Sequence, residues 1–160
     1  MITEEEFNNI YNEYHPKVYR LCLGYMSGNQ PLADDLAQEV FIKLWEKQNS
    51  IKDQKAISSW IYRVSFNTCM MSIRNNKKYS SNEIEDTPYQ PEQDQEASES
   101  LKQLYRIIEK LKADEKNMAL LLLEGVNTEN IAEVLGITKI NARVKIHRLR
   151  SKLKDEMEHL

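Results

Sequence analysis

The chain has 160 residues, a formal net charge of −3 and 41% hydrophobic residues, enough for one ordinary domain or two small ones. The acidic total is unlike that of proteins that coat nucleic acid by charge alone, so any DNA binding by the free protein should be weak. The sequence contains no zinc-protease, P-loop, nucleophile-elbow or CxxC motif, and its three histidines stand in separate contexts. We therefore expect neither an enzyme, nor a cofactor, nor a metal site.

The two cysteines, Cys22 and Cys69, lie far apart in helix-like segments. This placement is typical of reduced, buried thiols in a cytosolic protein. The N-terminal stretch MITEEEFNNIYNEY is acidic and amphipathic, unlike a signal peptide, and no apolar run approaches the roughly 18 residues of a membrane span. We expect a soluble cytoplasmic protein without direct membrane insertion.

Helical periodicity runs through most of the chain, and strand-like alternation is nearly absent. The first helices are expected near 3–14, 16–27, 31–48 and 56–77. Pro16 suits the first turn of the second of these helices. The sequence therefore predicts an all-α fold, with a break in the helix before Pro16.

The segment ADDLAQEVFIKLW has two different faces when it is read at 3.6 residues per turn. Its apolar stripe comprises Ala33, Leu36, Ala37, Val40, Phe41 and Leu44. The opposite face carries Asp35, Gln38, Glu39, Ile42 and Glu46. This second face is either an ordinary solvated surface with one exposed hydrophobe or a docking surface for a basic partner.

The helix expected near 56–77 also separates an apolar face from a polar one. The predicted core stripe is Ile57, Ile61, Val64, Thr68 and Met71, and the other face carries Arg63, Asn67, Met70 and Arg74 and continues into Lys77 and Lys78. Basic groups that alternate with an amide suit a DNA strand. Asn67 could instead be an ordinary surface amide.

The charge is unevenly distributed along the chain. Residues 1–78 carry a net charge of +1, residues 79–100 carry −7 and residues 101–160 carry +3. The middle segment, YSSNEIEDTPYQPEQDQEASES, has seven acids, no basic residue and too few apolar groups to offset its ordering entropy. We expect two small helical domains, 1–78 and 101–160, joined by a flexible acidic linker over 79–100.

The C-terminal part predicts helices near 98–111, 113–124, 128–135 and 139–157. Gly136, which tolerates a positive φ, and the small Ala132 sit where two helices must cross closely. Thr138 is expected to cap the last helix, whose buried stripe begins at Ala142 and Ile146. This pattern predicts a helix-turn-helix. The candidate DNA contacts are Lys139, Asn141, Arg143, Val144, Lys145, His147 and Arg148. A solvated amphipathic helix is the alternative interpretation.

Three stretches in order, ADDLAQEVFIKLWE, SWIYRVSFNTCMMSIRNNKK and IAEVLGITKINARVKIHRLRSKL, resemble the two-domain extracytoplasmic-function class of bacterial sigma factors. The resemblance implies a region 2-like domain, a region 4-like domain and a non-catalytic subunit that gives core RNA polymerase its promoter specificity and aids DNA opening. It further implies that the acidic helix docks on the polymerase through Asp34, Asp35, Gln38, Glu39 and Ile42. An anti-sigma factor, in many relatives linked to the inner membrane, is a further implied partner.

The same resemblance gives roles to the DNA-facing residues. It implies that Ser50, Ile51, Lys52 and Asn67 form a pocket for a base flipped from the minus-ten element, a site that favours sequences that melt easily. The remaining basic residues of that helix would contact the same DNA, and the last helix would read the minus-thirty-five element. Ile140, Asn141 and Ala142 depart from the residues with which relatives often begin this helix, so a relative's promoter sequence does not carry over. The rival interpretations are a stand-alone helix-turn-helix regulator and a helical adaptor.

Overall fold

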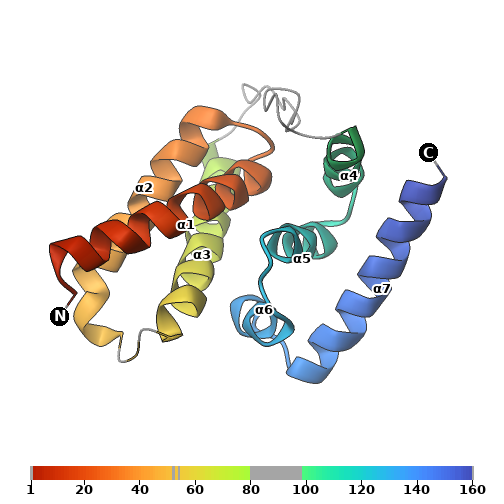
Figure 1. Ribbon diagram of the computed structural model, residues 1–160. Coiled ribbons are helices and arrows are strands. Elements are labelled where there is room, and N and C mark those ends of the chain that lie inside the picture. The colour runs from red at the N-terminus through yellow and green to blue at the C-terminus, as the bar shows by residue number, and fades with distance from the viewer. Residues whose placement is uncertain (1, 52, 54, 80–98, 160) are drawn as a thin grey trace. The chain divides into compact units, whose positions relative to one another are not determined.

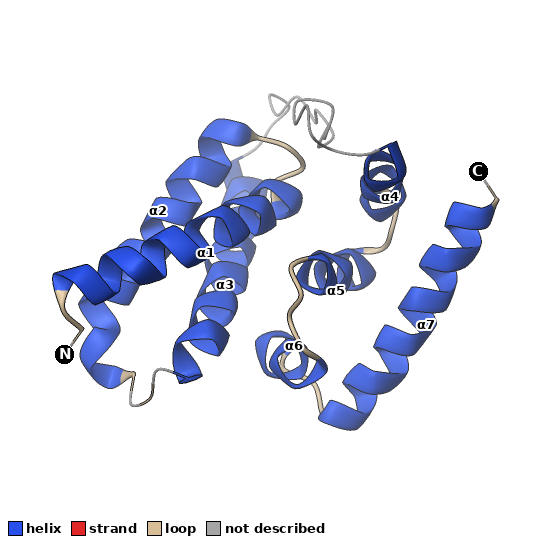
Figure 2. Cartoon of the chain, viewed as in Figure 1, coloured by secondary structure: helices blue, strands red, loops and turns tan. Residues whose placement is uncertain are grey.

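The structure, a computed structural model, describes residues 2–51, 53, 55–79 and 99–159, with the backbone alone for residues 76–79 (Figure 1). All regular structure in these residues is helical, which confirms the predicted all-α class (Figure 2). The helices are α1 (Glu4–Tyr25), α2 (Gln30–Lys47), α3 (Lys55–Tyr79), α4 (Glu99–Glu109), α5 (Ala113–Leu123), α6 (Thr128–Leu135) and α7 (Lys139–Glu158). A short 3-10 turn, Gln48–Ser50, follows α2.

These helices form two compact units, α1–α3 in the first and α4–α7 in the second. Two helical units agree with the two domains expected from the sequence. Most of the predicted acidic linker, residues 80–98, lies outside the described residues. The exact domain limits therefore stay predictions. No helix in the described part of the chain is both long and apolar enough to cross a membrane.

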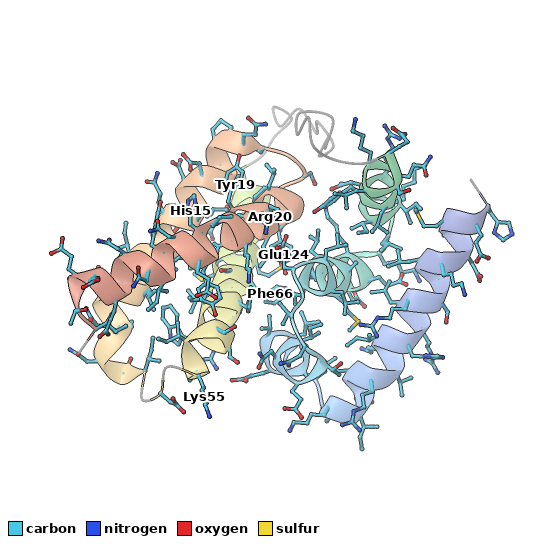
Figure 3. The ribbon with its side chains drawn as sticks, viewed as in Figure 1. His15, Tyr19, Arg20, Lys55, Phe66 and Glu124 are labelled. Atoms are coloured by element: carbon cyan, nitrogen blue, oxygen red, sulfur yellow. The ribbon has the colours of Figure 1, made fainter. Side chains whose placement is uncertain are left out.

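The predicted break before Pro16 is wrong, because α1 continues through this residue. A proline inside a helix loses one backbone hydrogen bond and costs about 3 kcal/mol. Ring contacts on both sides of Pro16 oppose that cost, because His15 stacks on Tyr11 and, one turn later, on Tyr19. Figure 3 labels His15 and Tyr19 on α1. The helix then buries a continuous stretch from Leu21 to Tyr25.

Helix α2 packs against both α1 and α3 and buries its whole predicted apolar stripe. Asn29 begins this helix, since its side-chain oxygen accepts a hydrogen bond from the Leu32 amide at 3.2 Å. The stripe predicted for α3 is only partly correct. Ile57, Ile61 and Thr68 are buried, but Met71 is 57% exposed and the burial runs instead through Ser65 and Cys69.

In the second unit, α6 and α7 form the predicted helix-turn-helix, and α7 packs against α4, α5 and α6. Gly136 ends α6 with φ of 69°, the left-handed conformation that favours glycine. A Cβ atom built at this position would meet no atom within 4 Å, so backbone conformation rather than close helix crossing explains the glycine. Thr138 caps α7 as predicted, because its hydroxyl oxygen accepts from the Asn141 amide at 3.1 Å.

Candidate functional site

The first candidate surface is the acidic ridge, which we define as the exposed face of α2 opposite its buried stripe. It comprises Asp34, Asp35, Gln38, Glu39 and Ile42. All five side chains are exposed as predicted, and Ile42 keeps 57% of its surface accessible. Since the opposite stripe already anchors the helix in the core, the ridge is not required for packing. It can therefore present three carboxylates and one apolar side chain to a partner.

Lys43 lies at the edge of the acidic ridge and was not identified from the sequence. Its ammonium group is 3.2 Å from a Glu39 carboxylate oxygen and donates a hydrogen bond of 3.1 Å to the Thr68 hydroxyl on α3. This side chain thus connects the ridge on α2 to the middle of α3, next to Asn67. The i, i+4 spacing of Glu39 and Lys43 was the available sequence signal for the ion pair, but nothing in the sequence indicated the bond to Thr68.

The candidate base pocket begins at the turn after α2. Gln48 is buried there, and both the oxygen and the nitrogen of its side-chain amide are hydrogen-bonded. Oε1 accepts from the Ile2 amide at 3.0 Å, and Nε2 donates to the Trp45 carbonyl at 2.9 Å. These bonds fix the turn that carries Ser50, which is exposed and donates to the Lys47 carbonyl at 2.7 Å. Gln48 is therefore a supporting residue that sequence reasoning missed.

Ile51 and Lys52, the next two residues predicted to form the base pocket, differ in what the structure describes of them. Ile51 is half-buried directly after the turn, and the predicted contact Lys52 lies outside the described residues. Asp53 then starts α3: its carboxylate accepts from the Lys55 amide at 3.1 Å and its carbonyl from the Ala56 amide at 2.9 Å. Lys55, at the first turn of α3, is labelled in Figure 3. Hydrogen bonds thus hold the chain at the turn Gln48–Ser50 and again at Asp53, just before α3 begins.

The DNA-facing side predicted for α3 is accessible where the structure describes it. Asn67 and Arg74 are exposed and Arg63 is half-buried. The exposed Met71, which the sequence assigned to the core, lies between Asn67 and Arg74 on the same side of the helix. Lys77 and Lys78 belong to α3, but their side chains lie outside the described residues. The described face is therefore cationic and polar, with one apolar side chain.

Below these surfaces the two cysteines meet in the core of the first unit. The Cys69 thiol donates a hydrogen bond to Cys22 Sγ at 3.6 Å, and both residues are fully buried. This hydrogen bond and burial raise the pKa of Cys69 far above its ordinary value. A protonated, inaccessible thiol is a poor nucleophile and a poor metal ligand. The described residues contain no cluster of histidine, cysteine and acidic side chains that could hold a metal.

The second candidate surface lies on α7. Ala142, Ile146 and Leu149 anchor this helix in the core of its unit, and every predicted DNA-contacting residue is exposed on the remaining surface. These residues are Lys139, Asn141, Arg143, Val144, Lys145, His147 and Arg148. Lys139 also lies 3.7 Å from a Glu129 carboxylate on α6, in a largely solvated ion pair. The structure thus brings all seven residues to the exposed, basic surface of one helix.

A helix-turn-helix with an exposed basic second helix defines a class of DNA-binding protein. Comparison with known proteins gives the family. The model for sigma-70 region 2 matches residues 10–79, and the model for sigma-70 region 4 matches residues 101–153. The first match falls within α1–α3 and the second within α4–α7.

Curated relatives align with nearly the whole chain. The ECF RNA polymerase sigma factor SigW of Bacillus subtilis is 28% identical, with 98% of this chain and 91% of the relative covered. The ECF RNA polymerase sigma-E factor of Haemophilus influenzae is 27% identical, with 98% and 90% covered. The sigma factor RpoE of Bartonella quintana, solved in complex with the anti-sigma factor NepR, has the same fold: the TM-score is 0.75 at 17% identity, covering 96% of this chain and 98% of that one.

The chain therefore belongs to the sigma-70 family of bacterial sigma factors, in its extracytoplasmic-function class. Proteins of this family are transcription initiation factors that bind core RNA polymerase and direct it to promoter DNA. The two rival interpretations, a stand-alone regulator and a helical adaptor, are not favoured by these matches.

Proposed function

We propose that the first unit binds core RNA polymerase through the acidic ridge of α2. The supporting observation is the exposure of all five ridge residues on a helix whose opposite stripe is fully buried. Carboxylates on such a surface suit a basic partner, and the exposed Ile42 at the end of the ridge adds apolar area that binding would remove from water. Lys43 forms an ion pair with Glu39 at the edge of this ridge and donates a hydrogen bond to Thr68 on α3.

The polar face of α3 and the turn before it are the proposed minus-ten surface. Asn67 offers both a donor and an acceptor to the edge of a flipped base, and Arg63 and Arg74 supply positive charge on either side of it. Ser50 and Ile51 would form the wall of the pocket, and Lys52, Lys77 and Lys78 are further proposed contacts to the same DNA. The Lys43 bond to Thr68 supports this assignment, because it ties the residue next to Asn67 to the docking helix.

The basic face of α7 is the proposed reader of the minus-thirty-five element. Residues near the N-terminus of a recognition helix contact base edges, and lysine and arginine side chains contact phosphates. We place the first functional domain at 1–78, the second at 101–160, and a flexible acidic linker at 79–100. Each domain carries a net positive charge of its own. This supports a protein in which the DNA contacts of the two domains cooperate when the polymerase holds both on one promoter.

We further propose that the protein acts in the cytoplasm, has no catalytic activity of its own and is regulated by an anti-sigma factor. The similar sigma factor of Bartonella quintana was solved in complex with an anti-sigma factor, which supports the last proposal. A membrane-linked anti-sigma factor would hold this protein at the inner membrane until release. Pull-down from cells before and after membrane removal would identify such a partner.

The experiment that tests the proposed function is reconstitution with core polymerase. The protein and core enzyme are mixed, separated by size, and supplied with genomic DNA fragments for transcription. We expect co-elution and a small set of defined transcript starts that core enzyme alone does not produce. If the protein binds an operator tightly by itself and never co-elutes with core enzyme, the proposed function is wrong. Binding to an acidic protein without any DNA effect would identify an adaptor instead.

A further inference from the structure

Two hydrophobic side chains stand out on the basic face of α7. Ile140 is 72% exposed and Val144 is 43% exposed, and in the described part of the second unit no other large hydrophobic side chain is exposed. They are four residues apart, so they occupy successive turns of one side of the helix. Together they form what we call the apolar pair.

The fold of the second unit does not need the apolar pair. Ala142, Ile146 and Leu149 bury the opposite side of α7. Isoleucine and valine are also weaker helix formers than the alanine, lysine or glutamate that would suit a solvated position. A single exposed hydrophobe is common on protein surfaces. Two β-branched residues on adjacent turns, within a basic face, are better explained by a ligand that covers them.

The surroundings of the apolar pair indicate what that ligand is. Exposed cationic side chains flank it, with Arg143 between its two members along the chain and Arg148 one turn beyond Val144. Thr138 caps the helix, so Ile140 lies in the first turn, the part of a recognition helix that approaches base edges. An apolar contact set among phosphate-binding charges suits an apolar group in the major groove of DNA. The 5-methyl group of thymine is that group.

We propose that Ile140 and Val144 read thymine methyl groups in the upstream promoter element and so set part of the promoter preference. A spacing of four helical residues is about 6 Å along the axis, and successive bases on one strand rise about 3.4 Å. The pair can therefore reach methyl groups one or two base-pair steps apart. The inference rests on the proposed function of α7 as a promoter-reading helix and adds Ile140, which the sequence motif did not identify.

The test uses the full-length protein in complex with core polymerase. A promoter is first selected by this holoenzyme from a pool with a randomised upstream element. Each thymine of the selected element is then replaced by deoxyuridine, which lacks only the methyl group. We expect about a fourfold loss of wild-type binding at one or two positions, the change that corresponds to exposing one buried methyl group. Other positions should be unaffected.

Variants connect those positions to the apolar pair. Ile140→Ala or Val144→Ala should weaken binding to the thymine promoter by a similar factor and then show no further loss on the deoxyuridine promoter. Lys154→Ala is the matched control, because Lys154 is an exposed residue of the same helix far from its first turns. This variant should keep the full sensitivity to deoxyuridine. Circular dichroism should show wild-type helicity for all three variants.

The outcomes separate this inference from the proposed function. If selection recovers an upstream element but deoxyuridine has no effect at any position, methyl reading is refuted and α7 remains a promoter-binding helix. If the losses from deoxyuridine and from alanine simply add, the apolar pair touches something other than the methyl groups and the inference is wrong. If selection recovers no upstream element at all, both the inference and the proposed role of α7 fail. The wild-type deoxyuridine scan decides the question even if a variant is unstable.

Discussion

Glu39 has two possible roles in the acidic ridge, and a pair of neutral substitutions distinguishes them. Its carboxylate lies 3.2 Å from Lys43, which in turn donates to Thr68 at 3.1 Å. If Glu39 only orients Lys43, removing either member of the ion pair should have the same effect. If Glu39 binds the polymerase, Glu39→Gln should weaken docking, whereas Lys43→Met should leave docking unchanged or strengthen it, because the carboxylate is then fully available to the partner.

The structure sets the size of these effects. The side chains of Lys43 and Glu39 are 37% and 51% exposed, and an exposed i, i+4 ion pair contributes about 0.3 to 0.5 kcal/mol. Glu39→Gln should therefore change the free energy of unfolding by no more than about 0.5 kcal/mol. Lys43→Met also removes a hydrogen bond to the buried Thr68 hydroxyl and should cost about 1 kcal/mol. Loss of a charge-assisted contact with polymerase is larger, about 1.5 to 3 kcal/mol, or roughly 10- to 150-fold in Kd.

The assay is fluorescence anisotropy of the labelled protein titrated with core polymerase at low and high salt, beside urea unfolding of each variant. Charge reversal of both Asp35 and Glu39 serves as the strong perturbation and should abolish co-elution while the protein stays folded. Wild-type affinity of this double variant would show that the ridge is not the docking surface. Equal weakening by Glu39→Gln and Lys43→Met would show that Glu39 acts only by holding Lys43.

Substitutions at Asn67, Arg148 and Cys69 test the polar face of α3, the basic face of α7 and the buried thiols. Asn67→Ala should slow open-complex formation and relax preference at one minus-ten position, and a premelted template should restore the rate but not the preference. An unchanged preference at every position would make Asn67 a surface amide. Arg148→Ala should weaken upstream-dependent initiation by about 1 to 3 kcal/mol if the lost contact is a bidentate base contact, or flatten the salt dependence of binding if it is a phosphate contact; a variant that changes neither would exclude Arg148 from the interface. Because the pKa of Cys69 is raised in the fold above its ordinary value of 9.0, the unfolded chain releases a proton that the folded chain keeps, so stability should fall above about pH 9 by up to about 1.4 kcal/mol per pH unit. Urea unfolding from about pH 8 to about pH 10.5, a window that spans the ordinary thiol pKa, should show a shallower fall for Cys69→Ala, and parallel curves would contradict the reasoning.

The two faces of α2 could be predicted from the sequence because one physical rule decides them. Six apolar residues at helical spacing need a core, and all six are buried. The same rule misplaced Met71 on α3. The predicted stripe from Ile57 to Met71 spans two heptads, and a straight helix drifts about 20° per heptad from such a repeat. Burial therefore moves to Ser65 and Cys69, and Met71 turns toward solvent.

Other features depend on contacts that no local pattern contains. The continuation of α1 through Pro16 is accompanied by rings that stack on both sides of it and by Phe41 of α2, which lies next to His15. The role of Gln48 as a buried support depends on an amide from the N-terminal residues, 46 positions away in the chain. Such long-range hydrogen bonds are a property of the packed unit, so residues of this kind were not found from the sequence.

The two helices that carry candidate surfaces, α2 and α7, each separate their packing residues from their exposed residues. In α2 and α7 the buried stripe and the exposed binding face lie on opposite sides, so substitutions on the exposed face leave the packing intact. Exposed substitutions usually change stability by only about 0.5 kcal/mol. Ile140 and Val144 can therefore vary with little cost to the fold, and under the proposed reading each change would alter which bases the helix fits. If α7 reads the promoter as proposed, its preference can change without altering the acidic ridge of α2, because the two surfaces belong to different compact units.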